Sequence, residues 1–205
     1  MKLNLTRLLS SWRWVVVLGA SCGAMSLAQV QAQTSERIAA SIPSANSHTA
    51  VVSIASLDVP RYMGTWYEIA KFPNKFQRKC ARHTRAQYLA QGDGTVQVLN
   101  RCLTESGEEI NALGLARQIG PNTSPKLKVR FAPAWLSWLP QVWGDYWVID
   151  LDDDYQLAAV SEPSREYLWV LSRTPSVNAN AYNALLKRLS AQGFDIGKLE
   201  RSPQP

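Results

Sequence analysis

Histidine is scarce in this sequence, which has two in 205 residues, His48 and His83. Catalysis by a nucleophile–histidine–acid set, or by a bound metal, needs several such groups close together. No such combination is visible around either histidine, so the sequence predicts no catalytic residues, no metal ligands and no cofactor. We therefore expect a binding protein. An enzyme is the alternative, because proteins that share a fold can have different functions.

Cysteine is scarce too, with Cys22, Cys80 and Cys102. Cys22 lies in the leader described below, which leaves one pair in the rest of the chain. In an exported protein such a pair indicates a disulfide, because the compartment is oxidising, and two buried thiols are the alternative. A Cys80–Cys102 bridge would be worth ~3 kcal/mol on the chain-entropy estimate. Free thiols would instead favour a cysteine mechanism, since cations flank Cys80.

The apolar run at residues 14–20 is short for a membrane span, which needs about 20 residues. Three basic residues precede this run and small residues follow it, which is the order of a secretory signal peptide. We expect residues 1–32 to be that peptide, with an uncleaved anchor as the alternative. Lipidation of Cys22 at a lipobox, which would anchor the chain to a membrane, is a second alternative. Leu18 lies one place further from Cys22 than that signal prefers.

A strong charge of one sign is missing once the leader is removed. Three of the 22 Lys and Arg and none of the 16 acids precede residue 33, which leaves 19 minus 16, or +3. The basic cluster is short, and acids such as Asp152 and Asp153 interrupt any extended stripe, so nucleic acid is not an expected partner. Residues 33–56 are rich in Ser and Ala and predict a flexible linker before the folded domain.

From Gly64 onward the apolar residues recur mostly with a period of two, in short segments separated by turn residues. Eight segments are predicted to be strands, namely 64–72, 83–91, 94–103, 108–118, 126–131, 145–151, 155–162 and 166–173. The stretch "QGDGT" predicts a tight hairpin between the second and third strands, because Gly92 and Gly94 can adopt positive φ.

After Pro175 the period changes to that of an amphipathic helix, with apolar residues at i, i+3, i+4 and i+7. These residues are Tyr182, Leu185, Leu186 and Leu189. Ser176 is the expected cap at the start of this helix and Gly193 at its end.

Eight sequential antiparallel strands favour closure into a barrel, because closure removes the sheet edges that would otherwise pair with other chains. At this strand number the interior holds either one small ligand or packed side chains. An outer-membrane barrel would need an unbroken apolar outer face. Here the faces opposite the apolar ones carry residues such as Arg85, Arg101 and Lys128, so we expect them to face water.

Three motifs resemble, in order and spacing, the sequence blocks of lipocalins: "GTWYEIA" after "LDVPRYM", then "GDYWVIDLDDDY", then "YLWVLSRTP". The nearest resemblance is to bacterial outer-membrane lipocalins related to apolipoprotein D. It covers about residues 57–200 and leaves 201–205 as a tail. It implies an all-β, eight-stranded antiparallel up-and-down barrel, closed at one end by a short N-terminal helical turn, with a C-terminal α-helix packed outside. The open end would admit fatty acids and lysophospholipids.

The resemblance also gives individual residues a role. Trp66 resembles the tryptophan at the closed end and Arg173 the arginine packed over it, a cation–π contact worth ~2 kcal/mol when buried. Alternation along the strands then predicts which side chains face a ligand. The predicted ligand-binding residues are Glu68, Ala70, Phe72, Tyr88, Tyr146, Val148, Tyr167 and Trp169. Side chains that simply fill a core are the alternative.

Glu68 is an exception in this set, because a buried carboxylate needs a partner or becomes protonated. The expected partners are the hydroxyls of Tyr88, Tyr146 or Tyr167, or a polar group of the ligand.

Connections 1–2 and 5–6 would lie at the open end. The first is rich in cations and the second in tryptophan, and together they give the residues expected to contact head groups or a membrane. These are Lys75, Arg78, Lys79, Arg82, Trp135, Trp138 and Trp143. A lid that folds over the barrel is the alternative for the tryptophan-rich connection.

The sequence thus predicts an exported protein of the periplasm or outer membrane, monomeric or homodimeric. It would carry or store a small amphiphilic lipid in the bacterial cell envelope. Besides the enzyme mentioned above, a binder of a tetrapyrrole or other pigment is an alternative, since a cationic rim suits propionates. No axial ligand for such a group is positioned, however.

Overall fold

A computed structural model describes residues 50–205. The predicted signal peptide, the first part of the linker and Cys22 lie outside the described residues, so those three remain predictions. The strands are β1 Gly64–Lys71, β2 Arg82–Ala90, β3 Val96–Leu103, β4 Glu109–Gln118, β5 Lys126–Arg130, β6 Gly144–Leu151, β7 Leu157–Ser161, β8 Leu168–Ser172 and β9 Glu200–Arg201. The helices are α1 Val59–Tyr62 and α2 Ala179–Ala191, with 3-10 turns η1 Lys75–Gln77, η2 Ala134–Leu136, η3 Pro140–Val142 and η4 Ile196–Lys198.

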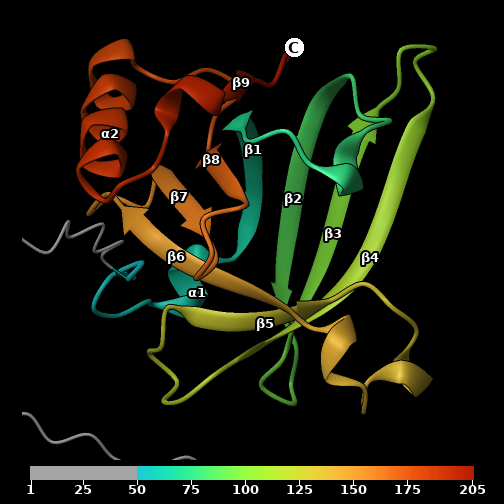
Figure 1. The fold of residues 1–205 in the computed structure, drawn as a ribbon. Helices are drawn as coiled ribbons and strands as arrows, with labels where there is room; N and C mark the ends of the chain where they lie inside the picture. Colours follow the sequence, from blue (N-terminus) through green and yellow to red (C-terminus); the bar gives the residue numbers. More distant parts are fainter. Residues whose placement is uncertain (1–49) are drawn as a thin grey trace, which may run out of the picture. The chain divides into compact units, whose positions relative to one another are not determined.

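Strands β1 to β8 form a closed antiparallel barrel (Figure 1). Each strand from β2 to β7 pairs with the next along the chain, and β1 closes the barrel by pairing with both β8 and β2. The eight predicted strands are therefore confirmed, with every boundary within two residues of the prediction. In the hairpin after β2, only Gly94 of the two predicted glycines has a positive φ, at 80°. Within residues 50–205 no helix is both long and apolar enough to cross a membrane.

Helix α2 packs against the outside of the barrel, as predicted (Figure 1). Its residues Leu185 and Leu189 are fully buried in an apolar cluster that also contains side chains of β1 and β6. The N-terminal cap differs from the prediction. Asn178 caps the helix in place of Ser176, because its side-chain oxygen accepts from the backbone N–H groups of residues 180 and 181. Gly193 follows the helix with φ 84°, the left-handed conformation expected there.

The base of the barrel is sealed by Trp66 and Arg173. The guanidinium carbon of Arg173 lies 4.0 Å from the centre of the indole ring. The same guanidinium donates to four backbone carbonyls, those of Arg61, Met63, Thr65 and Tyr155. Trp66 in turn donates from its ring nitrogen to the carbonyl of residue 62, at 2.9 Å. The predicted stacking of an arginine over the first-strand tryptophan is confirmed.

The wall between β1 and β2 is completed by a segment that the sequence suggested to be a tail. β1 pairs with β2 only from Gly64 to Tyr67. Beyond that point β1 pairs with β9, and Ser202 donates from its backbone N–H to the carbonyl of Ile69. On the other side, His83 donates from its backbone N–H to the carbonyl of residue 203. Residues 200–204 thus lie in the seam between the two strands.

The end of the predicted linker also packs on the barrel. Val51 is buried in the cluster beneath α2, and Ile54 donates from its backbone N–H to the carbonyl of Val148, at 3.0 Å. Residues 51–56 differ in this respect from the flexible linker predicted from their composition.

Substitution of Arg173 by Lys tests the seal at the base. Lysine keeps the charge, but it loses the planar stacking on Trp66 and the fork that reaches four carbonyls. We expect a loss of about 2 kcal/mol in the free energy of unfolding. Urea denaturation would measure it. Arg61→Lys is the matched control, because Arg61 also stacks on a ring at 4.0 Å, that of Tyr155, but is exposed. The control should lose less than about 1 kcal/mol. Equal losses in the two variants would contradict the proposed importance of this seal.

Candidate binding site

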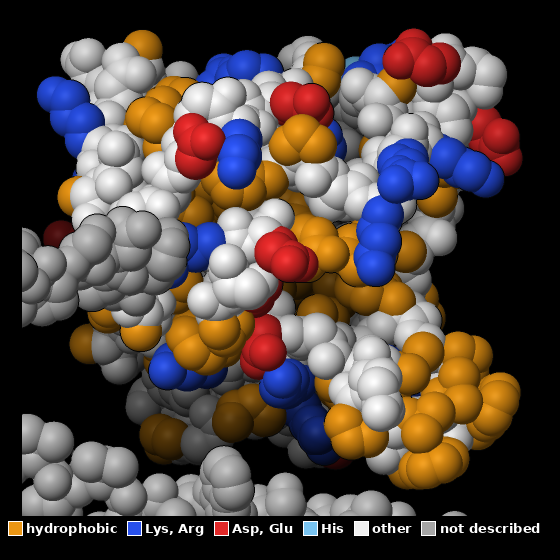
Figure 2. Space-filling view, viewed as in Figure 1, with side chains coloured by type: hydrophobic (Ala, Val, Ile, Leu, Met, Phe, Trp, Pro, Cys, Tyr) orange, Lys and Arg blue, Asp and Glu red, His pale blue; other side chains and the backbone are white. Residues whose placement is uncertain are grey.

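A cavity of about 730 Å³ occupies the barrel interior and is open at one end. Its opening is lined by residues of the β1–β2, β5–β6 and β7–β8 connections, such as Phe76, Phe131 and Glu166. Two of them, the β1–β2 and β5–β6 connections, are those that the sequence predicted at the open end. Figure 2 shows hydrophobic side chains in the recess on this face and again over the η2–η3 segment at lower right.

Five of the eight predicted ligand-binding residues lie in the wall of this cavity. They are Glu68, Tyr88, Tyr146, Tyr167 and Trp169. They come from four strands and one connection, so closure of the barrel brings together side chains that lie far apart in the sequence. Whether they contact a ligand remains a prediction.

The other three, Ala70, Phe72 and Val148, do not line the cavity. The pairing of β1 with β8 shifts between Glu68 and Ala70, and this irregularity breaks the alternation of sides. Ala70 and Phe72 consequently pack in the outer cluster beneath α2. Val148 packs in the inner cluster, where its neighbours cover it completely.

Three tyrosine hydroxyls meet in the inner part of the cavity. The hydroxyl of Tyr146 lies 3.0 Å from that of Tyr62 and 2.9 Å from that of Tyr88. Burial raises the pKa of Tyr88 to about 12, and it raises the pKa values of Tyr62 and Tyr146 well above the ordinary value. The hydroxyls are therefore neutral at physiological pH. Tyr62 was missed from the sequence, because it lies on α1 and outside the alternating strands.

Glu68 is held by partners other than the tyrosines expected for it. The side-chain amide of Gln77 donates to one carboxylate oxygen and the hydroxyl of Ser202 to the other, each at 2.5 Å. Gln77 also accepts from the ring nitrogen of Trp169, at 2.9 Å. Burial raises the pKa of Glu68, although its bonds to Ser202 and Gln77 act in the opposite direction.

The segment in the seam reaches this network as well. The side-chain amide of Gln204 donates to the backbone carbonyls of Glu68 and Thr84, at 2.7 and 2.9 Å. Together with Ser202, it fixes the carboxylate and its strand from the side where β1 and β2 have separated. None of these contacts was visible in the sequence, because the partners are more than 100 residues apart.

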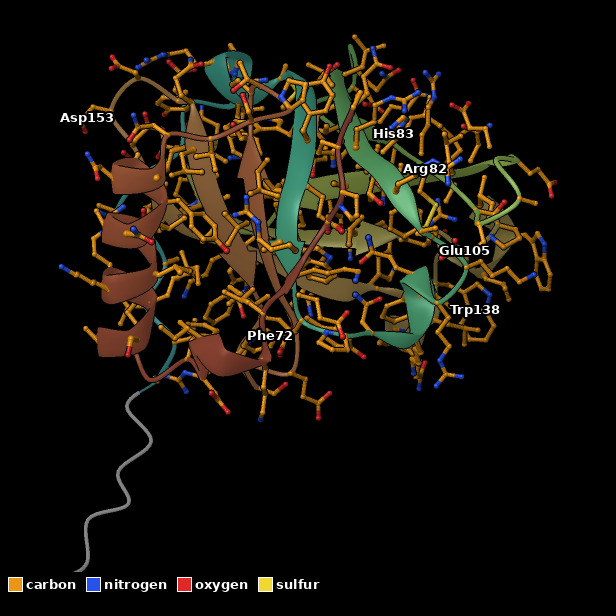
Figure 3. All side chains as sticks on the ribbon, turned by 90° about the horizontal axis from the view of Figure 1, so that it is seen from above. Phe72, Arg82, His83, Glu105, Trp138 and Asp153 are labelled. Carbon is orange, nitrogen blue, oxygen red and sulfur yellow. A yellow bond between two sulfur atoms is a disulfide. The ribbon has the colours of Figure 1, made fainter. Side chains whose placement is uncertain are left out.

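The four predicted cations of the β1–β2 region differ in exposure. Lys75, Arg78 and Lys79 are exposed on and beside η1, and none of them forms a salt bridge within the described part of the chain. Arg82 is half-buried, and its guanidinium lies against Gly107 of the β3–β4 connection (Figure 3).

Acidic residues also line the opening, and sequence reasoning had not assigned them there. Glu162 and Glu166 of the β7–β8 connection lie in the cavity wall. The carboxylate of Glu162 accepts from the backbone N–H groups of Ser164, Glu166 and Tyr167. This carboxylate therefore holds the turn in shape.

The three tryptophans of the β5–β6 connection differ in exposure. Trp135 and Trp138 are 74% and 75% exposed, and Figure 3 shows Trp138 on the side of the barrel away from α2. Trp143 instead lines the cavity, and the guanidiniums of Arg117 and Arg130 lie 4.3 and 5.3 Å from its ring centre. One tryptophan thus contributes to the cavity wall while two face outward.

The disulfide expected from the cysteine count is present. Cys80 and Cys102 are bonded, with their Cα atoms 5.4 Å apart, and both lie in the cavity wall. The bridge ties the basic β1–β2 connection to β3. Among residues 50–205 no three His, Cys, Asp or Glu side chains lie close enough together to hold a metal ion.

Replacement of Glu68 by Gln tests the effect of its burial on stability. Because its pKa is raised in the folded chain, the folded protein binds a proton that the unfolded chain has already released. The stabilisation that this proton provides is fully present below the pKa of Glu68 in the unfolded chain. It is lost as pH rises through the pKa of Glu68 in the folded chain. We expect the unfolding free energy of the Gln variant, relative to wild type, to rise as pH increases above about 4.

Urea titrations at several pH values would measure this difference. Glu105→Gln is the control, because that carboxylate is exposed in the β3–β4 connection. An unfolding free energy of the Glu68 variant, relative to wild type, that stays constant or falls as pH rises would contradict the interpretation.

Known proteins resemble this chain in both sequence and fold. Residues 57–204 match the family model described as "Lipocalin-like domain". The chain is 44% identical over 153 residues to temperature-induced lipocalin-1 of Arabidopsis thaliana, covering 74% of this chain and 81% of that protein. It is 36% identical over 156 residues to the outer membrane lipoprotein Blc of Escherichia coli, covering 76% and 84%.

Solved structures agree on the fold. The crystal structure of the allergen Per a 4 from cockroaches has a TM-score of 0.59 and 18% identity, covering 76% of this chain and 94% of that one. The matched family model spans all eight barrel strands and α2, and the curated relatives match over most of their length. This chain therefore belongs to the lipocalin family.

Proposed function

We propose that this lipocalin binds one amphiphilic lipid, a fatty acid or a lysophospholipid, and carries or stores it in the bacterial cell envelope. The observation that carries the proposal is the cavity of about 730 Å³. Its volume is in the range of small-molecule sites, which are typically about 300–1,000 Å³ and mostly apolar. Aromatic and aliphatic side chains such as Tyr88, Val98 and Trp169 line it.

The distribution of charge supports one orientation of such a ligand. The inner part of the cavity offers neutral hydroxyls and apolar side chains, whereas Lys75, Arg78 and Lys79 stand at the opening. An acyl chain would lie inside, and a carboxylate or phosphate head group would stay near these cations.

Two observations support the envelope as the site of action. The Escherichia coli relative is by name an outer membrane lipoprotein. The Cys80–Cys102 disulfide fits an oxidising compartment. A signal peptide over residues 1–32, with or without a lipid at Cys22, would bring the chain there.

The opening also has the features of a membrane contact. Trp135, Trp138 and Phe76 are largely exposed, and Phe76 lies beside the exposed cation Lys75 on η1. Tryptophan favours the boundary between water and lipid, and lysine and arginine are attracted to anionic head groups. In this arrangement the open end would face the lipid surface from which the ligand comes.

Obstruction of the cavity tests lipid binding. Ala112 of β4 lines the cavity, and its neighbour Leu113 is 60% exposed, on the opposite side of the strand by alternation. We expect Ala112→Trp to weaken binding of hexadecanoic acid and of lysophosphatidylethanolamine at least about tenfold, a change of ~1.4 kcal/mol. Native mass spectrometry and displacement of a fluorescent fatty acid would measure it.

Leu113→Trp is the matched control and should bind both lipids within about twofold of wild type. Two results would contradict the proposal: no lipid bound by wild type across both classes, or equal weakening in the two variants.

Removal of the two exposed tryptophans tests the membrane contact. We expect the double variant Trp135→Ser, Trp138→Ser to bind vesicles containing anionic phospholipid about tenfold more weakly in cosedimentation. Wild-type binding should also fall with added salt, since Lys75, Arg78 and Lys79 are exposed and screened. Leu113→Ser removes an exposed apolar side chain from the outer wall and serves as control. Unchanged vesicle binding by the double variant would exclude this contact surface.

A further inference from the structure

The inner part of the cavity contains a cluster of three hydroxyls, those of Tyr62, Tyr88 and Tyr146. They come from α1, β2 and β6, and all three residues lie in the cavity wall. The hydroxyl of Tyr146 is the middle member, at 3.0 and 2.9 Å from the other two. Within the part of the chain that the structure describes, these hydroxyls have no other hydrogen-bond partner.

The number of protons in this cluster exceeds the number of hydrogen bonds it can make internally. Each neutral tyrosine hydroxyl carries one proton to donate and can accept through its lone pairs. Three hydroxyls bring three protons, and each of the two contacts uses one. Whichever way the bonds run, one proton is therefore left over. A buried donor without an acceptor is unfavourable, so the cluster favours a ligand that offers one.

The surroundings favour a neutral acceptor over an anion. Arg173 supplies the positive charge that acts on Tyr62 and Tyr88. Its guanidinium is already engaged, because it stacks on Trp66 and donates to four backbone carbonyls. The carboxyl group of Glu68 lies in the same cavity wall and would repel an anion when ionised. An ionised group placed in this part of the cavity would lose its hydration without gaining a counter-ion.

We propose that the tyrosine cluster selects lipids whose inner end bears a neutral oxygen acceptor, such as a hydroxyl, an ether or a carbonyl, over lipids that end in a methyl group. This inference rests on the proposed function, since it requires a lipid whose chain enters the barrel. It narrows the ligand class from any single-chain amphiphile to chains that are polar at both ends.

Matched fatty acids test the selection on wild-type protein. Three series of 12, 14 and 16 carbons would be compared, ending in a methyl, a hydroxyl or a methoxy group. At the length that reaches the cluster we expect the hydroxyl and methoxy forms to bind about three- to tenfold more tightly than the methyl form. This range corresponds to one net neutral hydrogen bond. The methoxy series isolates the acceptor, because that group cannot donate.

Phenylalanine variants test the proton count. Each single change, Tyr62→Phe, Tyr88→Phe or Tyr146→Phe, still leaves at least one proton without a partner, so the preference should persist. The triple variant has no hydroxyls and should bind the three series equally. Its fold should survive, because replacing all hydrogen-bond partners by apolar groups of the same shape is nearly neutral. Thermal unfolding would check this.

Tyr167→Phe is the matched control, because Tyr167 lines the same cavity but stacks on Trp169 away from the cluster. It should keep the full preference. Equal binding of the three series by wild type at every length would overturn this inference and leave lipid binding intact. Persistence of the preference in the triple variant would also overturn it. Failure of wild type to bind any of the series would instead count against the proposed function.

Discussion

Contact between one guanidinium and one indole at the base is the constraint on which the rest of this barrel depends. Arg173 follows β8 and Trp66 lies in β1, so their stacking joins strands from opposite ends of the domain. The four carbonyls that accept from Arg173 belong to α1, its surroundings, β1 and the β6–β7 connection. With the base closed in this way, the interior above it has no need of packed side chains for support and can stay hollow.

Alternation of apolar residues was sufficient to predict every barrel strand, because one face of each strand is buried and the other meets water. The same rule failed wherever the pairing is irregular. Ala70 and Phe72 lie on the far side of a β1 irregularity, and nothing in "GTWYEIAKF" reveals that shift. The N-cap was misplaced by two residues because Ser176 and Asn178 are both suitable caps, and only the local backbone decides between them.

The polar residues of the site were harder to predict than the apolar ones, since their partners are distant in sequence. Glu68 was expected to need a partner, which is correct, but Gln77 and Ser202 take the places expected for tyrosines. The tyrosines bond to one another instead. As a result, the polar groups differ between the inner part of the cavity, its wall and its surroundings. Uncharged hydroxyls lie inside, a buried carboxyl group held by two neutral donors lies in the wall that Arg85 and Arg101 also line, and three exposed cations lie on and beside η1.

The seam between β1 and β2 has a consequence for how the chain reaches its native state. Its last contacts join Glu68 to residues 202 and 204, at separations of 134 and 136 positions. Contacts of such high sequence separation are slow to form, because the intervening loop must close first. Ordering of the cavity wall at this point thus waits for nearly the whole domain, so the pocket is completed by a late step of folding.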